Sequence, residues 1–288
     1  MDIAILAARD SWYFRDLQRA AGERHRLTPI SYKRLGSHVA GSRLSLSAGG
    51  VDLGAVDAML VRSMPPGSLE QVVFRMDALA RLEAAGVRVV NPARAIEAAV
   101  DKYLATAKLQ AAGLLVPATV VCQTAADALD AFEALGGDVV VKPLFGGEGH
   151  GITRVSDAAV ARRVFMALEQ IGAVLYVQQF IPHDGVDWRL LVIGDDVLGM
   201  KRINPDDWRT NISLGARPAP LEVTVELAQL ARRAAAAVGA SVAGVDLLPA
   251  RDGRLYAIEV NAVPGWRALG DVTGVDVAVR VLGLVVGC

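Results

Sequence analysis

The sequence predicts an α/β protein with two or three subdomains, and two observations support this prediction. The chain has 288 residues, which is long enough for more than one hydrophobic core. Short apolar runs alternate with amphipathic helical stretches in residues 1–95, whereas later apolar runs come in pairs joined by turns. The first pattern is typical of an open α/β unit, and the second indicates β-hairpins.

Residues 1–95 are expected to form the open α/β unit. Helical spacing of apolar residues before Gly22 and Gly86 indicates two helices, since glycine commonly ends a helix. The expected strands cover residues 3–7, 56–62 and 87–90, and the expected helices cover residues 12–21 and 69–85.

A second region is expected to begin where a helix-forming stretch follows the first unit. The stretch 94–112 is mostly helix-forming, and Lys102 opens a helix after Asp101. Residues 204–219 are polar and predict a long loop, and loops of more than about twelve structureless residues are usually functional or disordered. The other expected strands are 119–122, 139–142, 152–155, 175–181, 187–193 and 197–203, and the other expected helices are 124–135, 157–171, 223–238 and 276–286.

Residues 244–265 are expected to form a hairpin with oxygen side chains on one face. Asp246 lies inside the first apolar run, and Glu259 and Asn261 alternate at the end of the second. Carboxylates are costly on a half-buried sheet unless a cation compensates them, and Mg²⁺ takes carboxylate and amide oxygens. The hairpin therefore predicts a magnesium site, and three solvated polar residues on an edge hairpin are the alternative.

A glycine-rich loop follows the strand that ends at Lys142. Four of the seven residues 145–151 are glycine: Gly146, Gly147, Gly149 and Gly151. Such a loop lets backbone N–H groups approach phosphate oxygens with no Cβ in the way. It lacks the GK[ST] of a Walker A sequence, and an extended run rather than a helix follows it, which argues against a Rossmann fingerprint. A flexible hairpin tip beside a snorkelling lysine is the alternative.

Other charged side chains leave their role open when each is taken alone. Lys102 by itself suggests a solvated helix lysine, and Asp187 with Arg189 on one strand face suggests a salt bridge. The long loop and the strand before it hold Arg202, Arg209 and Asn211. Guanidinium groups there can bind a carboxylate or a transferring phosphate.

Composition argues against several classes of function. The formal net charge is -1, with 30 basic and 31 acidic residues, so no overall field draws the chain to nucleic acid or to an anionic membrane. Charges interrupt every long apolar run and no secretory pattern begins the chain, so we expect a cytoplasmic protein without a membrane span. The two cysteines and four histidines have neither the spacing of a disulfide framework nor that of a zinc site. The sequence leaves open whether the protein forms a homo-oligomer.

The order of these features resembles the ATP-grasp superfamily, and most closely its RimK-like branch of carboxylate–amine ligases. The matching segments are Lys102, VVVKPL at 139–144 with the glycine turn, VQQFI at 177–181, DWR at 187–189, DWRTN at 207–211, GVD at 244–246, EVN at 259–261 and PG at 264–265. The resemblance covers essentially the whole chain. It implies an α/β pre-ATP-grasp domain at 1–95, a central subdomain with a glycine lid at 96–182 and a C-terminal subdomain at 183–288, with ATP between the last two.

The resemblance also implies a role for each matching residue. It implies that the ATP phosphates contact Lys102, Lys142 and the loop of Gly146, Gly147, Gly149 and Gly151. It also implies that the adenine borders Gln178, Gln179, Phe180 and Ile181, and that Asp187 lies near the ribose. For the chemistry, it implies that Arg209, Thr210 and Asn211, helped by Arg202, face the reacting phosphate and the substrate carboxylate. The implied metal ligands are Asp246, Glu259 and Asn261, which would hold one or two Mg²⁺ or Mn²⁺ ions.

Members of this branch activate a carboxylate as an acyl phosphate, which an amine attacks to form an amide, with release of ADP and phosphate. The implied function is an ATP- and Mg²⁺-dependent ligase that joins an amino acid, with L-glutamate as the first candidate, to a small-molecule carboxylate acceptor. The alternatives are a ligase acting on a protein C-terminus or an amino-acid carrier, and a non-catalytic nucleotide-binding ATP-grasp protein.

One segment bears on the acceptor. Residues 60–66 look like those of glutamate ligases that act on tetrahydromethanopterin-type pterins, which makes such a pterin the candidate acceptor. Arg62 and Ser63 either reach that acceptor or cap local structure. Trp266 and Arg267 replace the small or acidic residues often found after the metal hairpin, and would suit a planar, acidic acceptor.

Overall fold

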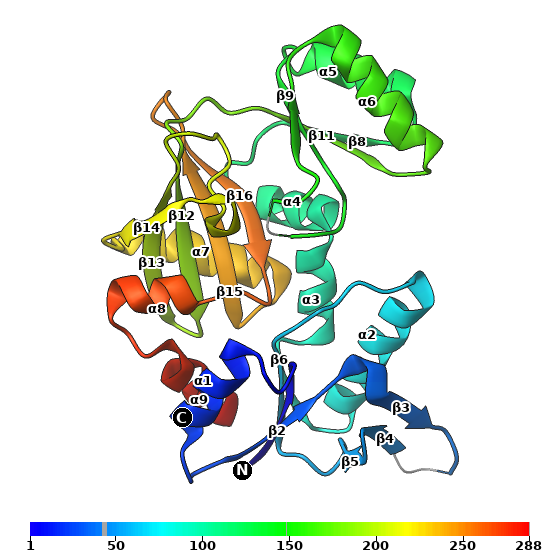
Figure 1. The fold of residues 1–288 in the computed structure, drawn as a ribbon, viewed down its shortest axis with the longest axis vertical. Helices are drawn as coiled ribbons and strands as arrows, with labels where there is room; N and C mark the ends of the chain where they lie inside the picture. The colour runs from blue at the N-terminus through cyan, green and yellow to red at the C-terminus, as the bar shows by residue number, and fades with distance from the viewer. Residues whose placement is uncertain (42–44, 148, 288) are drawn as a thin grey trace.

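A parallel sheet with the strand order β2-β1-β6-β7 forms the N-terminal unit (Figure 1). The computed structural model describes residues 1–41, 45–147 and 149–287. The unit contains β1 (Asp2–Leu6), α1 (Trp12–Ala21), β2 (Arg26–Ile30), the 3-10 turn η1 (Tyr32–Arg34), β6 (Ala58–Val61), α2 (Leu69–Ala84) and β7 (Arg88–Val90), with a small sheet of β3 (Leu35–His38), β4 (Ser45–Ala48) and β5 (Val51–Asp52). Ser11 and Ser68 cap α1 and α2, because each hydroxyl accepts the N–H three residues later. The two predicted helices are confirmed to within one residue.

Two helices connect this unit to the central one. The mostly helix-forming stretch 94–112 is divided into α3 (Ala93–Val100) and α4 (Lys102–Ala111). Asp101 separates them, and its carboxylate accepts the Leu104 N–H at 3.0 Å. This cap fixes the start of α4 and so places Lys102 in its first turn.

The central unit is an antiparallel sheet with two helices on one face. Its strands, in the order β10-β9-β11-β8, are β8 (Thr119–Cys122), β9 (Val139–Lys142), β10 (Thr153–Val155) and β11 (Leu175–Gln179), and its helices are α5 (Ala125–Ala134) and α6 (Ala158–Gln170). Alternate strand residues, among them Val141 and Val177, share a core with Phe132 and Phe165 of these helices. The intervening strand residues therefore face the other way, toward α4.

The C-terminal unit is an antiparallel sheet with the strand order β14-β13-β12-β15-β16. It comprises β12 (Val186–Ile193), β13 (Asp196–Ile203), η2 (Ile212–Leu214), β14 (Arg217–Pro220), α7 (Val225–Val238), β15 (Val242–Pro249), β16 (Leu255–Asn261), α8 (Arg267–Thr273) and α9 (Val277–Val286). The expectation of one structureless loop over 204–219 is wrong at its end, because β14 pairs with β13 and forms the edge of the sheet. The sequence did not predict this strand because Pro218 and Pro220 argue against one, since proline is found in strands mainly at the edge of a sheet.

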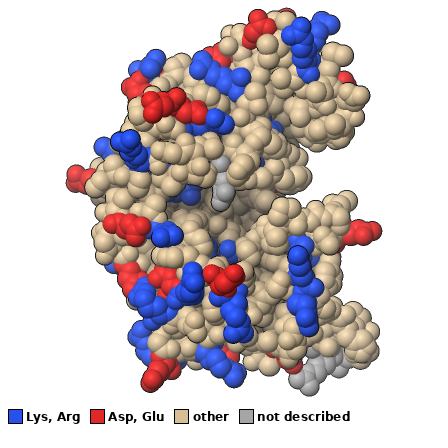
Figure 2. Space-filling view, in the orientation of Figure 1, with Lys and Arg blue, Asp and Glu red and all other residues tan. Residues whose placement is uncertain are grey.

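The N-terminal and C-terminal units share hydrophobic cores, whereas the central unit has its own. Helix α9 packs against α1, and Leu17 of α1 lies in the same buried cluster as Val281 of α9 and Leu191 of β12. Boundaries at residues 95 and 182 therefore stay a prediction. Figure 2 shows basic and acidic side chains interspersed over a face that is hollowed at mid-height. Among the helices of the described ranges, none is long and apolar enough to cross a membrane.

Candidate active site

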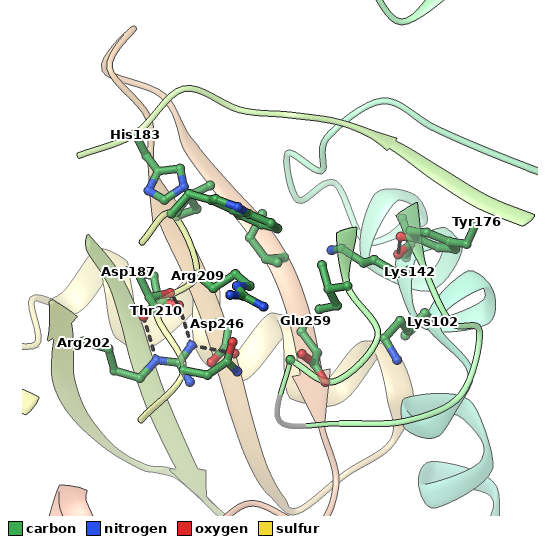
Figure 3. A pocket seen from close by; sticks show the side chains of 18 of the residues that line it. Lys102, Lys142, Tyr176, His183, Asp187, Arg202, Arg209, Thr210, Asp246 and Glu259 are labelled. Atoms are coloured by element: carbon green, nitrogen blue, oxygen red, sulfur yellow. Dashed lines mark hydrogen bonds and ion pairs between the residues drawn. The ribbon is translucent and has the colours of Figure 1, made fainter. Parts of the chain in front are cut away.

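One face of the C-terminal sheet gathers charged side chains from four neighbouring strands. Arg202 of β13 pairs with Asp187 of β12, while Asp246 of β15 pairs with both Arg189 of β12 and Glu259 of β16. Residues paired across a ladder share a face, so all five side chains lie on one side of the sheet. Apolar residues of α7 cover the other side. The charged face forms one wall of a cavity (Figure 3).

The cavity brings together most of the predicted site residues. Those in its lining are Lys102, Lys142, Gly149, Asp187, Arg202, Arg209, Thr210, Asn211, Asp246 and Glu259. The lining residues to which the sequence assigned no role are Ala99, Ala105, Thr106, Leu109, Ile152, Tyr176, His183, Trp208, Leu248 and Ile258. Alternation along the strand after Asp246 was a signal for Leu248. No sequence signal pointed to Tyr176, because its pairing with Lys142 is known only from the register of the two strands.

Asp187, Arg189, Arg202 and Asp246 form a buried cluster of two anions and two cations. Arg202 donates from Nε to Asp187 Oδ1 at 2.7 Å and from Nη2 to Asp246 Oδ2 at 2.8 Å, and also pairs with the second oxygen of Asp187. Arg189 Nη2 donates to Asp246 Oδ2 at 2.9 Å, its Nε contacts Oδ1, and Thr210 donates its hydroxyl to Asp187 Oδ2 at 2.6 Å. The two charges of each sign balance, so the cluster is close to neutral.

Burial and pairing have opposite effects on the two acids of this cluster. Burial favours the neutral form of Asp246, but the Arg189 and Arg202 guanidinium groups outweigh it and lower the pKa to about 2. At Asp187 burial is the larger effect and raises the pKa, against the opposing influence of Arg202. Asp246 is therefore the more acidic of the two carboxyl groups. The expected place of Asp187 beside a ribose stays a prediction.

The three predicted metal ligands lie on this same face. Asn261 pairs with Gly244 across the β15–β16 ladder, two residues from the Asp246–Glu259 pair, so the three side chains project together. A carboxylate offers about four acceptor positions, and the three guanidinium contacts of Asp246 leave one. Asn261 Oδ1 accepts the Val263 N–H at 2.8 Å and keeps a second lone pair.

The donor set of these three side chains fits a hard cation. Within the described residues no group of three His, Cys, Asp or Glu side chains is placed to hold a metal. The site would therefore depend on the Asn261 amide as its third protein donor, with water or phosphate oxygens completing the shell. The assignment of Asp246, Glu259 and Asn261 as metal ligands stays a prediction.

The two predicted lysines face this wall from the other side of the cavity. Lys142 Nζ donates to Gln178 Oε1 at 2.6 Å, and Lys102 Nζ donates to the Gly146 carbonyl at 2.7 Å. Burial lowers the pKa of Lys142 to about 8 and also lowers that of Lys102, while the Glu259 carboxylate acts in the opposite direction on both. Two ammonium groups therefore lie across the cavity from the carboxylates of the sheet, and this arrangement suits a ligand with several phosphate groups.

The glycine-rich loop touches the long loop of the C-terminal unit. Gly149 has φ +77°, and a Cβ built on it would lie 2.6 Å from Asn211 Oδ1. Gly146 and Gly151 also have positive φ, whereas Gly147 does not and has open space where a Cβ would be. Only Gly149 of the described loop glycines lines the cavity. A Cβ on Gly151 would lie 2.8 Å from Pro143 Cγ, so positions 149 and 151 of the loop both require glycine.

The segment predicted to border an adenine does not line the cavity. Gln178 is 3% exposed and hydrogen-bonded within the central unit, Gln179 is exposed, and Ile181 lies in a small cluster with Leu248. Phe180 packs edge-on against Trp208 at 5.8 Å. Contact of Gln178, Gln179, Phe180 and Ile181 with a nucleobase stays a prediction.

The expectation that Trp266 faces an acceptor is wrong. Trp266 is 1% exposed, its ring lies 4.1 Å from the Arg62 guanidinium, and its indole N–H donates to Asp16 at 3.0 Å. Arg62 is itself buried and donates to the Pro264 carbonyl at 2.7 Å, while Ser63 donates to a carbonyl of β1. Arg62 and Trp266 join the N-terminal and C-terminal units, whereas the Ser63 contact lies within the N-terminal unit. Arg267, by contrast, stays exposed.

Comparison with known proteins decides the family. A model of the RimK-like ATP-grasp domain matches residues 99–285. Over 314 aligned positions, the chain is 32% identical to a tetrahydromethanopterin:alpha-L-glutamate ligase of Methanosarcina acetivorans, covering 97% of this chain and 96% of that protein. The chain belongs to the RimK-like ATP-grasp family. This RimK-like protein is also 28% identical to a glutamate–LysW ligase, ArgX, of Sulfurisphaera tokodaii, over 80% of this chain and 82% of that one.

Solved structures agree with the family assignment. The ATP-grasp ligase PsnB bound to a minimal precursor superposes with a TM-score of 0.79 at 22% identity, over 99% of this chain and 98% of PsnB. A RimK domain protein of Sphaerobacter thermophilus has a TM-score of 0.75 at 26% identity, over all of both chains. The predicted ATP-grasp fold is confirmed. The RimK-like protein is an ADP-forming carboxylate–amine ligase, as the resemblance implies.

Proposed function

We propose that this RimK-like ligase uses ATP and Mg²⁺, or Mn²⁺ in its place, to join L-glutamate to the carboxylate of an acceptor molecule. An acceptor carboxylate oxygen attacks the terminal phosphorus of ATP, ADP leaves, and the glutamate amine then displaces phosphate from the acyl carbon and loses a proton. The observation that carries the proposal is the cavity itself, in which two lysines face a wall of carboxylates and guanidinium groups.

The residues around the cavity can perform this chemistry without a covalent protein nucleophile. Phosphoryl transfer depends chiefly on positioning and on neutralising charge. Lys102 and Lys142 would hold the phosphates beneath the glycine loop, and Arg202 and Arg209 would hold the acceptor carboxylate and the transferring phosphoryl group. A metal ion bound by Asp246, Glu259 and Asn261 would supply further positive charge at the phosphates.

Arg209 is already oriented by its neighbours. Its guanidinium donates to Asp207, with an Nη2–Oδ2 distance of 2.6 Å, and its carbonyl accepts from Asn204 Nδ2 at 2.8 Å. Asn204 is buried, so the backbone of the loop is fixed at this point. The Asp207 pair is half-exposed, and a substrate carboxylate can therefore compete for Arg209 at small cost.

For the acceptor we favour a small molecule, and a pterin of the tetrahydromethanopterin type is the first to test. The support is the name of the Methanosarcina relative and the likeness of residues 60–66 to such ligases. The ArgX relative is named as a ligase of glutamate and LysW, so its name points to another acceptor, and a protein C-terminus or an amino-acid carrier is the second candidate. Arg267 is an exposed cation that follows the metal hairpin, and it is the first residue to vary for acceptor choice.

The decisive experiment measures ADP release with L-glutamate and each acceptor class, followed by mass spectrometry for the glutamyl-extended product. A product from one class with stoichiometric ADP supports the proposal and names the acceptor. No ADP release with pterin, peptide and amino-acid-carrier acceptors would overturn it in favour of a non-catalytic nucleotide-binding protein.

Binding of ATP should take up a proton above neutral pH. Burial holds the pKa of Lys142 at about 8 in the free protein, and a neighbouring phosphate would stabilise the ammonium form and raise that pKa. At about pH 8.5 we expect uptake of about 0.7 proton per nucleotide, and affinity should fall as the pH rises above the free pKa. Calorimetry in buffers of different ionisation enthalpy measures the uptake. Lys142→Met should abolish it, and unchanged uptake in that variant would contradict the assignment.

Gly149→Ala should lower kcat/KM by about tenfold or more. Its φ of +77° costs an alanine roughly 1–2 kcal/mol, and the new Cβ would displace Asn211. Gly147→Ala is the matched control, because it adds the same methyl group to the same loop in open space. Steady-state kinetics of both variants test the contact, and equal losses in the two would contradict it.

A further inference from the structure

A chain of side-chain hydrogen bonds runs from Lys142 on β9 to Thr106 on α4. Lys142 donates to Gln178 Oε1 at 2.6 Å, Gln178 Nε2 donates to the Tyr176 hydroxyl at 3.0 Å, and Tyr176 lies 2.8 Å from Thr106 Oγ1. All of these strand residues lie on the face of the central sheet that looks toward α4, with Tyr176 directly opposite Lys142. The chain therefore crosses from the sheet to the helix that begins with Lys102.

The partners of Gln178 allow its amide only one orientation. Lysine is a donor with no acceptor, so it must meet the oxygen of the amide. Thr119 donates its own hydroxyl proton to the Pro117 carbonyl at 2.8 Å, so it can only accept from Gln178 Nε2, at 2.9 Å. Both amide protons are then used, by Thr119 and Tyr176. Tyr176 accepts from Gln178 and shares a further hydrogen bond with Thr106, in which either oxygen can donate.

The donors from Lys142 through Gln178 to Tyr176 consequently point the same way, from the cavity toward α4. Hydrogen bonds arranged head to tail strengthen one another, and Tyr176 and Gln178 are 1% and 3% exposed, so water does not compete for them. An amide also orients the lysine without neutralising it, as a carboxylate at the same position would. Lys142 is thus held in place with its charge available to a ligand.

We propose that Tyr176 and Thr106 are positioning residues that fix Lys142 relative to the Lys102 end of α4, so that the two ammonium groups meet the phosphates of one nucleotide. This inference rests on the proposed function, in which both lysines bind ATP phosphates. It assigns Tyr176 and Thr106 no contact with the transferred group. Their removal should weaken binding only of ligands that carry phosphates.

The test compares ATP, ADP and adenosine binding to Thr106→Val, Thr106→Ser and Tyr176→Phe by calorimetry. We expect Thr106→Val and Tyr176→Phe to raise the Kd of ATP and ADP by about fivefold, the value of one neutral hydrogen bond, and to leave that of adenosine within about twofold. Thr106→Ser keeps the hydroxyl and should retain wild-type affinity. Thr106→Val keeps the shape of the side chain but loses the hydroxyl, and should therefore bind ATP and ADP more weakly.

Each outcome separates this inference from the proposed function. If the wild-type protein binds no ATP, the proposed function fails. If it binds ATP and both Thr106→Val and Tyr176→Phe match it, the positioning role is overturned. Equal loss of ATP and adenosine binding would also overturn it, because that result indicates general damage to the cavity. Circular dichroism and the thermal midpoint of each variant show that the fold is retained.

Discussion

Glu259→Gln is expected to lower kcat for ADP release by about a thousandfold at saturating Mg²⁺. Glu259 lies across the ladder from Asp246, in the cavity wall that faces both lysines. Asp246 already shares its oxygens with Arg189 and Arg202, so Glu259 is the carboxylate with more freedom to bind a cation. Glutamine keeps the shape and one oxygen but removes the charge. Steady-state ADP release over a Mg²⁺ titration measures the effect, and exposed Glu222→Gln is the matched control.

Nucleotide binding in EDTA distinguishes loss of the metal site from general damage. The Glu259 carboxylate favours the charged forms of Lys102 and Lys142. It also repels the phosphates of a metal-free nucleotide, so its removal should leave metal-free ATP binding unchanged or tighter. Turnover near the wild-type rate, or an equal fall in binding with and without Mg²⁺, would contradict the assignment of Glu259 to the metal.

The charged wall could be predicted from the sequence because it follows from strand periodicity. Asp246, Glu259 and Asn261 share a face as soon as residues 244–265 form a hairpin, and the β15–β16 register confirms that hairpin. The helix cap at Asp101 likewise fixes Lys102 locally. The ordered series of weak motifs then selected the family, which the comparisons confirm.

Contacts between distant segments could not be predicted in this way. The pairing of Asp246 with Arg189 and Arg202 depends on which strands are neighbours, and β12 lies between β13 and β15 in the sheet. The burial of Trp266 depends on Arg62, which is about two hundred positions away and belongs to another unit. From the sequence alone, Trp266 suggested a contact with a ligand. In the structure it packs instead between the N-terminal and C-terminal units.

The same joint contains the residue whose loss should affect stability most. Asn91 follows β7 and is 1% exposed, and its amide makes four hydrogen bonds to the C-terminal unit. Nδ2 donates to the carbonyls of Val242 at 2.7 Å and Ala262 at 2.6 Å, and Oδ1 accepts the N–H groups of Ser241 at 2.8 Å and Val242 at 3.0 Å. Asparagine is the residue type with two donors and one acceptor oxygen in this compact shape.

Asn91→Ala should lower the free energy of unfolding by about 4 kcal/mol, because it leaves the buried backbone groups of Val242 and Ala262, and the partly buried N–H of Ser241, without the Asn91 partner. For a chain of this size, that corresponds to a fall of about 10 °C in the thermal midpoint. Asn204→Ala removes another buried asparagine, but one that ties a loop to itself, and should cost about 1 kcal/mol. Equal midpoints for the two variants would contradict the role of Asn91. Since Ala262 directly follows Asn261, the Asn91 variant should also weaken Mg²⁺ binding, which a loss of stability elsewhere in the fold would not do.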